Sequence, residues 1–342
     1  MKHANGHWLG IVNPLTLVGN EVKSILRERS FPAERVVLLD STGAAAGALT
    51  EIGDEPAVVT AVSDDELEDL DLVFFCGPAE KNREWLNRAD DDAFYAVDLS
   101  QPSTVEEGKL AVAGVNLDEM SENDRVLISP HPVAIPLALV LHQIEQAGWV
   151  EICTATVVQP ASEFEQAGIE ELAQQTLGVL NIQGVPKDVF HRQLAFNLYP
   201  AAEHNEDYIV GQVRALTDPR TQIALLVTQG TIFHSHTFSL FLKSEGEVDV
   251  EAIKSALRAN AAIAVAEPDE QLGTIDAAGR DQVLIAESAA RSIDPRRILG
   301  LGGLRQSAPQ LRAQCGAGGG EGSGWDGGQL ILSEAKDLRL DR

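Results

Sequence analysis

Residues 8–29 read WLGIVNPLTLVGNEVKSILRER. The segment begins with an apolar run typical of a buried strand, and after a turn Val22, Ile25 and Leu26 recur with the spacing of one helix face. A strand, a turn and a helix in this order begin a βαβ nucleotide-binding unit. The segment therefore predicts an α/β, doubly wound domain in the N-terminal part of the chain.

Further apolar runs extend this domain. Continuous runs of this kind are typical of strands that are buried on both faces of a parallel sheet. They are RVVLL at 35–39, DLVFF at 71–75 and FYAVDLS at 94–100. The N-terminal third of the chain therefore carries the strand pattern of a Rossmann-type sheet.

The composition limits both the size and the partners of the protein. A chain of 342 residues is long enough for two domains, each with its own core. Its 52 Asp and Glu residues outnumber its 26 Lys and Arg residues, and the formal net charge is -26. Because such a surface repels phosphate backbones and anionic lipid, we expect no nucleic-acid partner and no membrane partner.

The three cysteines Cys76, Cys153 and Cys315 lie far apart and have no metal-type spacing. This usage suits a reducing compartment better than a disulfide framework. Residues 1–7 contain no apolar signal core, and no later run approaches the roughly 20 apolar residues of a membrane span. We therefore expect a cytoplasmic protein.

Several short motifs between residues 8 and 294 resemble the aspartate-semialdehyde dehydrogenase family. Each motif is weak alone, but their order and spacing match the family. They are FP at 31–32, VDLS at 97–100, VN at 115–116, AGIEEL at 167–172 and RQLAFNLYP at 192–200.

The resemblance implies a fold and an assembly. It implies a Rossmann-type NAD-binding-like domain over residues 1–128 and an α+β dimerisation and substrate domain over residues 129–297. In the family the sheet of the second domain mediates dimerisation, so we expect a homodimer. That sheet should be mostly antiparallel, with strands near 152–158, 222–227 and 238–243 and a long helix at 163–180 lying on it.

The first turn of the family is a G-x-x-G-x-x-G loop whose backbone N–H groups approach the cofactor pyrophosphate. The matching residues 13–19 read NPLTLVG, so only Gly19 remains. Pro14 has no N–H to donate, and the side chains of Asn13 and Thr16 occupy space that the family leaves to the cofactor. Thr16 can also cap the next helix and touch a phosphate. A structural turn without dinucleotide is favoured over retained binding, and both interpretations stay open.

Two further positions bear on the cofactor. After the second strand the family places a serine-arginine pair for the phosphate of NADP, whereas residues 40–47 of this chain read DSTGAAAG. Asp40 repels such a phosphate and suits a ribose diol, so NAD is favoured over NADP and either would bind weakly. Gly77, within CGPA at 76–79, resembles the family loop beneath the nicotinamide ribose.

The catalytic cysteine of the family aligns with Pro132. Family chemistry needs a thiolate that attacks the aldehyde and forms a covalent intermediate. Residues 129–134 read SPHPVA where the family has NPNCST, and Pro132 offers no nucleophile. His131 and Ser129 are close in sequence, but this spacing indicates a coincidence rather than a catalytic dyad. Cys153 lies in an apolar strand and is expected to pack there.

Other catalytic positions are partly retained. The substrate-orienting glutamine of the family is present as Gln159, but two loop glycines are replaced by Glu163 and Glu165. Their charges oppose an anionic substrate. Thr228 stands where the family has an arginine that binds the substrate carboxylate.

Ser235 stands where the family has its general-base histidine, between His234 and His236. Because alternate residues of a strand face the same way, the two histidines should share a face opposite Ser235. A His-x-His pair can ligate a metal, but no third ligand is identifiable, so we expect no metal site. An interior or interface pair of satisfied histidines is the favoured interpretation.

Two functions of different classes follow. The first is a dimeric pseudoenzyme, most similar to family paralogues that lack the catalytic cysteine, because nucleophile, carboxylate anchor, base and phosphate cradle are all replaced. The second is a divergent NAD(P)-dependent oxidoreductase acting on an aldehyde or oxo group, in or near amino-acid biosynthesis. That enzyme would use Gln159, His131 or His234 as polar groups. The sequence does not identify a small-molecule ligand.

Residues 298–342 are rich in glycine and include LGLGG at 299–303 and CGAGGGEGSG at 315–324. The family ends with a long amphipathic helix, but glycine costs roughly 1 kcal/mol per helical position, so no such helix forms here. We expect residues from 298 onward to be flexible, either as a genuine tail or as the product of a frameshift.

Overall fold

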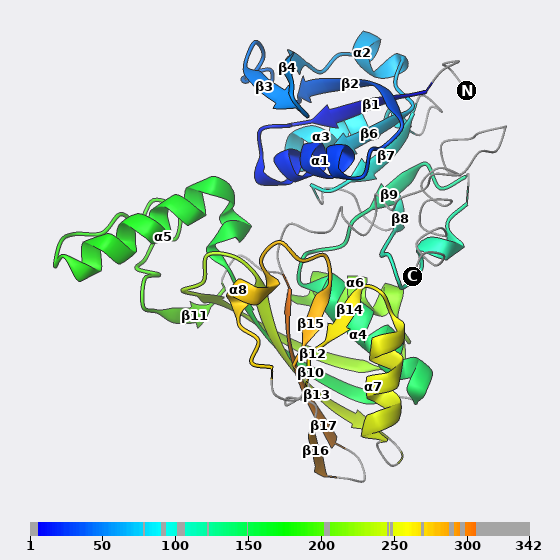
Figure 1. Cartoon of the computed structure of the whole chain (residues 1–342), viewed down its shortest axis with the longest axis vertical. Coiled ribbons are helices and arrows are strands. Elements are labelled where there is room, and N and C mark those ends of the chain that lie inside the picture. Colours follow the sequence, from blue (N-terminus) through cyan, green and yellow to red (C-terminus); the bar gives the residue numbers. More distant parts are fainter. Residues whose placement is uncertain are drawn as a thin grey trace. The chain divides into compact units, whose positions relative to one another are not determined.

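The computed structural model divides the chain into two compact units. One unit runs to Pro130 and the other begins at His131. Figure 1 shows the elements of both units, coloured along the sequence. The described residues are 6–77, 79–89, 94–100, 107–121, 123–148, 150–201, 206–244, 246, 249–267, 270–286, 291–294 and 298–305.

The first unit contains a seven-stranded sheet whose neighbouring strands, as far as they are described, are all parallel. The strand order is β5-β2-β1-β6-β7-β9-β8. The doubly wound α/β prediction is therefore confirmed. The strands are β1 (His7–Val12), β2 (Ala33–Asp40), β5 (Thr60–Ala61), β6 (Leu72–Phe75), β7 (Tyr95–Asp98), β8 (Lys109–Leu110) and β9 (Val126–Ile128).

The helix α1 (Leu17–Glu28) forms where the apolar spacing predicts it. Its buried residues Val22, Ile25 and Leu26 pack into the same core as Leu9 and Ile11 of β1. Leu117 of the 3-10 helix η2 (Leu117–Glu119) belongs to this core, and the hairpin of β3 (Leu49–Ile52) and β4 (Glu55–Val58) packs against it. The unit also contains the helices α2 (Asp64–Glu68) and α3 (Ala79–Leu86).

The strand order of the first unit reverses at β1, which pairs with β2 on one side and with β6 on the other. In doubly wound folds ligands bind outside the carboxyl ends of the strands at such a reversal. The residues after β1, β2, β6 and β7 therefore form the candidate cofactor edge of this unit.

The second unit contains an eight-stranded mixed sheet. β10 pairs in parallel with β12, and β14 with β15, whereas the other neighbours are antiparallel. The mostly antiparallel sheet is therefore confirmed. Its strands are β10 (Val150–Gln159), β11 (Leu198–Pro200), β12 (Gln222–Gly230), β13 (His236–Ser244), β14 (Ile263–Val265), β15 (Val283–Ile285), β16 (Arg291–Asp294) and β17 (Ile298–Arg305).

One face of this sheet is covered and the other is open. Figure 1 shows α4 (Ala134–Ala147), α6 (Glu206–Leu216) and α7 (Val250–Ala259) gathered on one side of the sheet. Along β10, Cys153, Ala155 and Val157 are buried, whereas the alternating Thr154 and Thr156 are exposed. The short helix α8 (Thr274–Ala277) lies in the connection between β14 and β15.

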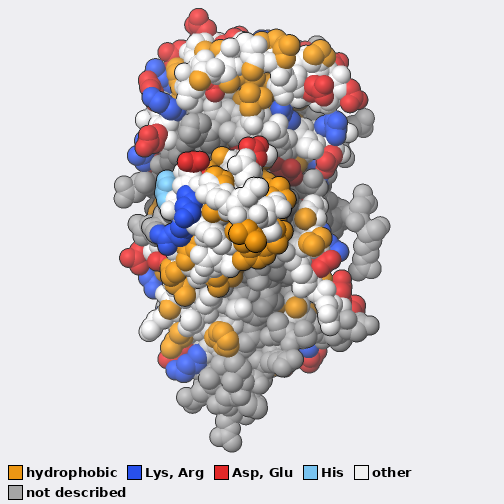
Figure 2. Space-filling model, turned by 90° about the vertical axis from the view of Figure 1, so that its left-hand side faces the viewer, with side chains coloured by type: hydrophobic (Ala, Val, Ile, Leu, Met, Phe, Trp, Pro, Cys, Tyr) orange, Lys and Arg blue, Asp and Glu red, His pale blue; other side chains and the backbone are white. Residues whose placement is uncertain are grey.

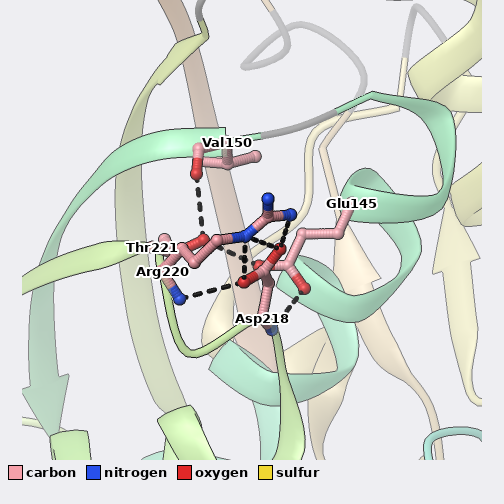
Figure 3. A network of polar contacts seen from close by, with 5 residues as sticks. All are labelled: Glu145, Val150, Asp218, Arg220 and Thr221. Atoms are coloured by element: carbon pink, nitrogen blue, oxygen red, sulfur yellow. Dashed lines mark hydrogen bonds and ion pairs between the residues drawn. The ribbon is translucent and has the colours of Figure 1, made fainter.

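A polar network holds α4 to the start of this sheet (Figure 3). The Glu145 carboxylate accepts hydrogen bonds from the Asp218 N–H at 2.9 Å and the Thr221 hydroxyl at 3.0 Å. That hydroxyl also lies 2.9 Å from the Val150 carbonyl oxygen. Arg220 forms a salt bridge of 2.5 Å with Asp218 within the same turn. These contacts are structural, because they join a helix end, a turn and two strands.

The long helix of the second unit differs from the prediction in its placement. It begins after the 3-10 helix η3 (Ala161–Phe164) and forms α5 (Glu165–Leu180). Figure 1 shows α5 projecting to the left of the sheet rather than lying on it. Leu172 of this helix packs against Phe190 and Leu194 of the returning chain. The expectation that the helix lies on the sheet is therefore wrong, because its apolar face is covered by its own return segment.

The glycine-rich stretch at 298–305 also differs from the prediction. It forms β17, which pairs antiparallel with β13 along its whole length. A Cβ atom at Gly303 would lie 2.4 Å from Cζ of Phe238, so glycine gives the aromatic ring of the paired strand its space. The expectation of flexibility from 298 onward is wrong for these residues. Residues 306–342 lie outside the described part of the chain.

Among the residues that the structure describes, no helix combines the length and the apolar character needed to cross a membrane.

Candidate functional site

Asn13 lies at the centre of the candidate cofactor edge. It follows β1 with a φ of 59°, a left-handed conformation that asparagine tolerates better than most residues. Its Oδ1 accepts hydrogen bonds from the N–H and the hydroxyl of Ser41, each at 3.0 Å. Its Nδ2 donates to the Cys76 carbonyl at 2.8 Å and to Oδ1 of Asn82 at 3.1 Å. One buried amide thus joins the ends of β1, β2 and β6 to α3.

The network continues to the end of β7. Asn82 Nδ2 donates to the Ser100 hydroxyl oxygen at 2.9 Å, and it also contacts the Cys76 carbonyl oxygen. Ser100 in turn donates through its N–H and its hydroxyl to Oδ1 of Asp98, each at 2.9 Å. Asn82 and Asp98 are completely buried. Polar groups at this edge are therefore satisfied by one another, as buried polar groups require.

Thr16 and Gly19 serve the turn between β1 and α1. The Thr16 hydroxyl accepts from the Gly19 N–H at 3.0 Å and donates to the Asn13 carbonyl at 2.9 Å, so Thr16 caps α1. A Cβ atom at Gly19 would lie 2.4 Å from the Asn13 carbonyl oxygen. The one glycine that remains of the family loop is therefore required by helix packing.

Asp40 and Gly77 occupy the remaining positions of the candidate cofactor edge. The buried Asp40 carboxylate accepts from the Thr42 hydroxyl at 2.8 Å and the Ala45 N–H at 3.1 Å, so Oδ2 is engaged by its own loop. Gly77 is partly exposed, and nothing lies within 4 Å of a Cβ atom built there. A side chain at position 77 would therefore meet no steric clash at its Cβ atom.

The sequence indicated Asn13 but neither its partners Ser41 and Asn82 nor Ser100, which bonds Asn82. Ser41 and Ser100 each come directly after or close to the end of a predicted strand, and this position was the available signal. Asn82 lies within a helix and gave no signal, because its contacts come from residues far away in sequence.

The segment around Pro132 leads into α4. The His131 N–H donates to Oε1 of Gln212 at 2.8 Å, and Nδ1 of His131 accepts from the Val133 N–H at 3.1 Å. The imidazole is buried, and its Nδ1 is used to shape the turn before the helix. Pro132 therefore sits in a segment that is fixed by contacts of its neighbours.

Gln159 and Thr228 lie on the paired strands β10 and β12. Gln159 is completely buried, and its Nε2 donates to Oε1 of Gln229 at 2.6 Å. These two glutamines are direct partners in the parallel register. The Thr228 hydroxyl donates to the Val157 carbonyl at 2.9 Å. Both side chains are engaged within the sheet, and Gln229 was not singled out from the sequence.

His234, Ser235 and His236 are arranged differently from the prediction. β13 begins only at His236, and Ser235 before it has a φ of 75°, so strand alternation does not apply to the three residues. His234 is exposed, whereas His236 is completely buried. The expectation that the two histidines share one face as a pair is therefore wrong. The buried Ser235 hydroxyl donates to the Thr274 carbonyl at 3.1 Å.

The Glu163 carboxylate faces His236, with 3.3 Å between Oε2 and Nε2. Glu165, two residues later, begins α5 with a φ of 56°. The Glu163 carboxylate therefore lies against an interior imidazole. No group of three His, Cys, Asp or Glu side chains that could hold a metal occurs within the described ranges.

The thiols of Cys76 and Cys153 are completely buried. Burial, with a smaller contribution from the Glu145 carboxylate, raises the pKa of the Cys153 thiol to about 12. At neutral pH this thiol is protonated and is therefore a poor nucleophile.

Comparison with known proteins covers both units. The family model "Semialdehyde dehydrogenase, NAD binding domain" matches residues 11–134, and "Semialdehyde dehydrogenase, dimerisation domain" matches residues 141–295. A USG-1 protein homolog of Azotobacter vinelandii is 28% identical over 285 residues, which cover 80% of this chain and 84% of the relative. An aspartate-semialdehyde dehydrogenase of Rickettsia bellii is 22% identical, with 73% of this chain and 77% of the relative covered.

Two solved structures of similar fold also match the chain. A probable aspartate-semialdehyde dehydrogenase from Pseudomonas aeruginosa matches with a TM-score of 0.83 at 25% identity, over 90% of this chain and 96% of that chain. Aspartate semialdehyde dehydrogenase II from Vibrio cholerae matches with a TM-score of 0.84 at 21% identity, over 98% and 99%. The second likeness supports the fold alone. The two domain matches together with these likenesses show that the chain belongs to the semialdehyde dehydrogenase family.

Proposed function

We propose that this chain is a dimeric aspartate-semialdehyde-dehydrogenase-like protein of the cytoplasm that does not perform the thiol chemistry of the family. The observation that carries the proposal is Pro132, at the position that aligns with the family's nucleophilic cysteine. Covalent aldehyde oxidation needs a thiolate that reaches the substrate carbonyl. Proline supplies no such group, and the thiols of Cys76 and Cys153 are buried in the cores of their units.

The candidate cofactor edge supports weak dinucleotide binding at most. A pyrophosphate at a βα turn is held by free backbone N–H groups and by the space that glycines leave. Here the Thr16 hydroxyl accepts a hydrogen bond from the Gly19 N–H, and the side-chain amide of Asn13 joins the ends of three strands. A bound dinucleotide would have to replace hydrogen bonds that the protein already makes.

The homodimer is proposed from the dimerisation-domain match over residues 141–295. The open face of the sheet in the second unit agrees with this assembly, because Leu226 and Phe241 are exposed on it. Single large apolar side chains on a surface are common, but side chains on one open sheet face suit a contact between subunits.

The divergent oxidoreductase has less support from the same residues. Nε2 of Gln159 donates to Gln229, and Nδ1 of His131 accepts a backbone N–H, so these two nitrogen atoms are already engaged within the protein. His234 is exposed and precedes β13, so the strand does not fix the orientation of its side chain.

A fluorescence titration with NADH and NADPH tests the proposal. We expect no saturable binding below the millimolar range, with NADH the better ligand because Asp40 disfavours a 2′-phosphate. A matched titration of Asp40→Asn removes the negative charge but keeps a side-chain oxygen that can accept the hydrogen bonds of the 40–45 loop. It therefore measures the effect of the charge on the preference for NADH over NADPH. Tight saturable binding of either dinucleotide by the unaltered protein would favour the oxidoreductase.

A further inference from the structure

The chain from residue 36 to residue 80 contains 11 Asp and Glu residues but no Lys or Arg. Residues 49–69 of this stretch form the acidic segment, which comprises the β3–β4 hairpin, β5 and α2. Its exposed acidic residues are Glu51, Asp54, Glu55, Asp64, Asp65, Glu68 and Asp69. Figure 2 shows Asp and Glu side chains distributed over the face in view, as a net charge of -26 requires. A surface of one sign repels itself, and dissolved salt screens the repulsion.

Cationic side chains reach the acidic segment from α1 and from the residues that follow α3. The Arg27 guanidinium lies 3.9 Å from the Asp54 carboxylate, and the Arg88 guanidinium lies 3.2 Å from the Asp64 carboxylate. All four side chains are at least 47% exposed, and ion pairs of this kind contribute little to stability. The buried Lys23 amine also donates a hydrogen bond to the hairpin at 2.8 Å. Because the carboxylates outnumber these cations, the segment as a whole is repulsive at low ionic strength.

The elements of the acidic segment are short. α2 has five residues, and β5 pairs with β2 at two positions. Glu68 and Asp69 lie at the C-terminal end of α2, where the helix dipole opposes negative charge and no basic residue is present in the last turn. The buried side chains of Val59, Leu67 and Leu70 anchor this part of the chain. Short elements with few buried contacts open before the rest of a domain does.

Backbone hydrogen bonds join the acidic segment to the loop between β2 and β3, which borders the candidate cofactor edge. The Gly47 N–H donates to the Val59 carbonyl at 2.8 Å, and the Val59 N–H donates to the Ala48 carbonyl at 2.9 Å. At the other end of the loop, the Val62 N–H donates to the Asp40 carbonyl at 3.1 Å. Movement of β5 and its flanking residues away from β2 therefore releases the loop at both ends.

The same loop holds one side of the Asn13 network. Ser41 donates through its N–H and its hydroxyl to Oδ1 of Asn13, each at 3.0 Å. The Asp40 carboxylate is held by Thr42 and Ala45 of the loop. Release of the loop thus frees Oδ1 of Asn13 and the Asp40 carboxylate together, and the cofactor edge opens.

We propose that ionic strength controls the closure of the candidate cofactor edge through the acidic segment. At about 10 mM salt the carboxylates repel one another over a Debye length of roughly 30 Å, so β5 and α2 separate from β2 and the loop is released. At about 1 M salt the Debye length is roughly 3 Å, and the segment closes. The consequence for dinucleotide binding rests on the proposed function, whereas the opening itself does not.

Hydrogen exchange of the full chain, followed by mass spectrometry in about 10 mM and about 1 M KCl at one pH, tests the proposal. We expect peptides that contain the N–H groups of residues 47, 59 and 62 to exchange at least about tenfold faster at low salt. Peptides of β1 should exchange equally in both solutions. NaCl should act as KCl does, because screening depends on ionic strength and not on the identity of the cation.

Two charge-reduced variants locate the effect. Glu55→Gln/Glu68→Gln removes two charges from the acidic segment and keeps the size of both side chains. We expect the salt dependence of exchange at residues 47–62 to fall at least about threefold in this variant. The matched control Glu170→Gln/Glu267→Gln removes two exposed charges from the second unit and should keep the full salt dependence.

Equal exchange of these peptides at both salt concentrations overturns the proposal. An equal loss of salt dependence in the two double variants also overturns it, because the net charge and not the acidic segment would then be responsible. Protection by KCl without protection by NaCl would show a bound cation in place of screening. No dinucleotide is present in these measurements, so tight NADH binding in a separate titration contradicts the proposed function and leaves the exchange result unchanged.

Discussion

The candidate cofactor edge of the first unit and the arm of the second unit, formed by α5 and its return segment over residues 165–197, are both organised by buried amide and carboxylate side chains. They differ in what these side chains hold together. At the edge, Asn13 and Asn82 form hydrogen bonds with each other and with residues at the ends of neighbouring strands. In the arm, Glu171 and Gln175 order the inside, and Ile182 stays outside. The difference teaches that buried polar side chains can join neighbouring strand ends in one place and hold a projecting helix and its return segment together in another.

The largest effect is expected from loss of the arm's central carboxylate. Glu171→Ala leaves three backbone N–H groups of residues 188–190 without their acceptor, so we expect a loss of about 3 kcal/mol in the free energy of unfolding of the second unit. Urea denaturation measures the loss, and hydrogen exchange of residues 188–190 locates it.

Glu170→Ala is the matched control, because Glu170 is exposed and accepts a hydrogen bond from the exposed Gln166 side chain. We expect less than about 0.5 kcal/mol for this change. Unchanged exchange at residues 188–190 in Glu171→Ala would show that the arm is held by its apolar contacts alone.

A smaller loss is expected at the cofactor edge. Asn13→Gly keeps the left-handed turn but removes four hydrogen bonds to Ser41, Cys76 and Asn82. We expect a loss of about 2 kcal/mol in the stability of the first unit, measured by urea unfolding. Asn87→Gly, at an exposed position after α3, is the comparison. Equal midpoints for the two variants would mean that the Asn13 network does not stabilise this edge.

A third prediction concerns pH and the thiol of Cys153. Because burial raises its pKa to about 12 from an ordinary value of 9.0, the thiol is largely neutral in both the folded and the unfolded state below about pH 9. Above that pH the unfolded chain releases the proton and the folded chain keeps it. The contribution of this group to stability is therefore complete below about pH 9 and is lost as the pH rises toward 12.

Urea midpoints at about pH 8 and about pH 10 measure this effect. The unaltered chain should lose more stability between the two conditions than Cys153→Ala does. An identical loss in both chains would show that the thiol ionises as freely in the folded state as in the unfolded one.

The sequence predicted those features that depend on local pattern. The apolar run of β1 and the helical spacing of Val22, Ile25 and Leu26 identified the first unit, because burial on one helix face leaves a periodic trace. The strand expected near 152–158 came from the family resemblance, and it forms as part of β10. The parallel pairing of β10 with β12 was not foreseen, since register and direction depend on partners that are distant along the chain.

Other features needed distant contacts that no local pattern contains. Gly303 in β17 leaves space for the ring of Phe238. The glycines that disfavour a helix in this segment therefore allow close packing in a strand. The positive φ of Ser235 breaks the alternation on which the pairing of His234 and His236 was predicted. The four hydrogen bonds of Asn13 involve residues 28, 63 and 69 positions away, which explains why the sequence indicated Asn13 as a candidate cofactor residue and not as a link between strand ends.

The most direct test of the central claim is phosphate-dependent oxidation of aspartate semialdehyde with NAD and with NADP, measured on the purified chain and on a Cys76→Ser/Cys153→Ser double variant. The account predicts no reduction of either dinucleotide by any of these proteins. Pro132→Cys alone should also stay inactive, because Thr228 and Ser235 still replace the carboxylate anchor and the base. Turnover well above background that persists in the double variant would contradict the account, since it would require a nucleophile or a mechanism other than the one that Pro132 removes.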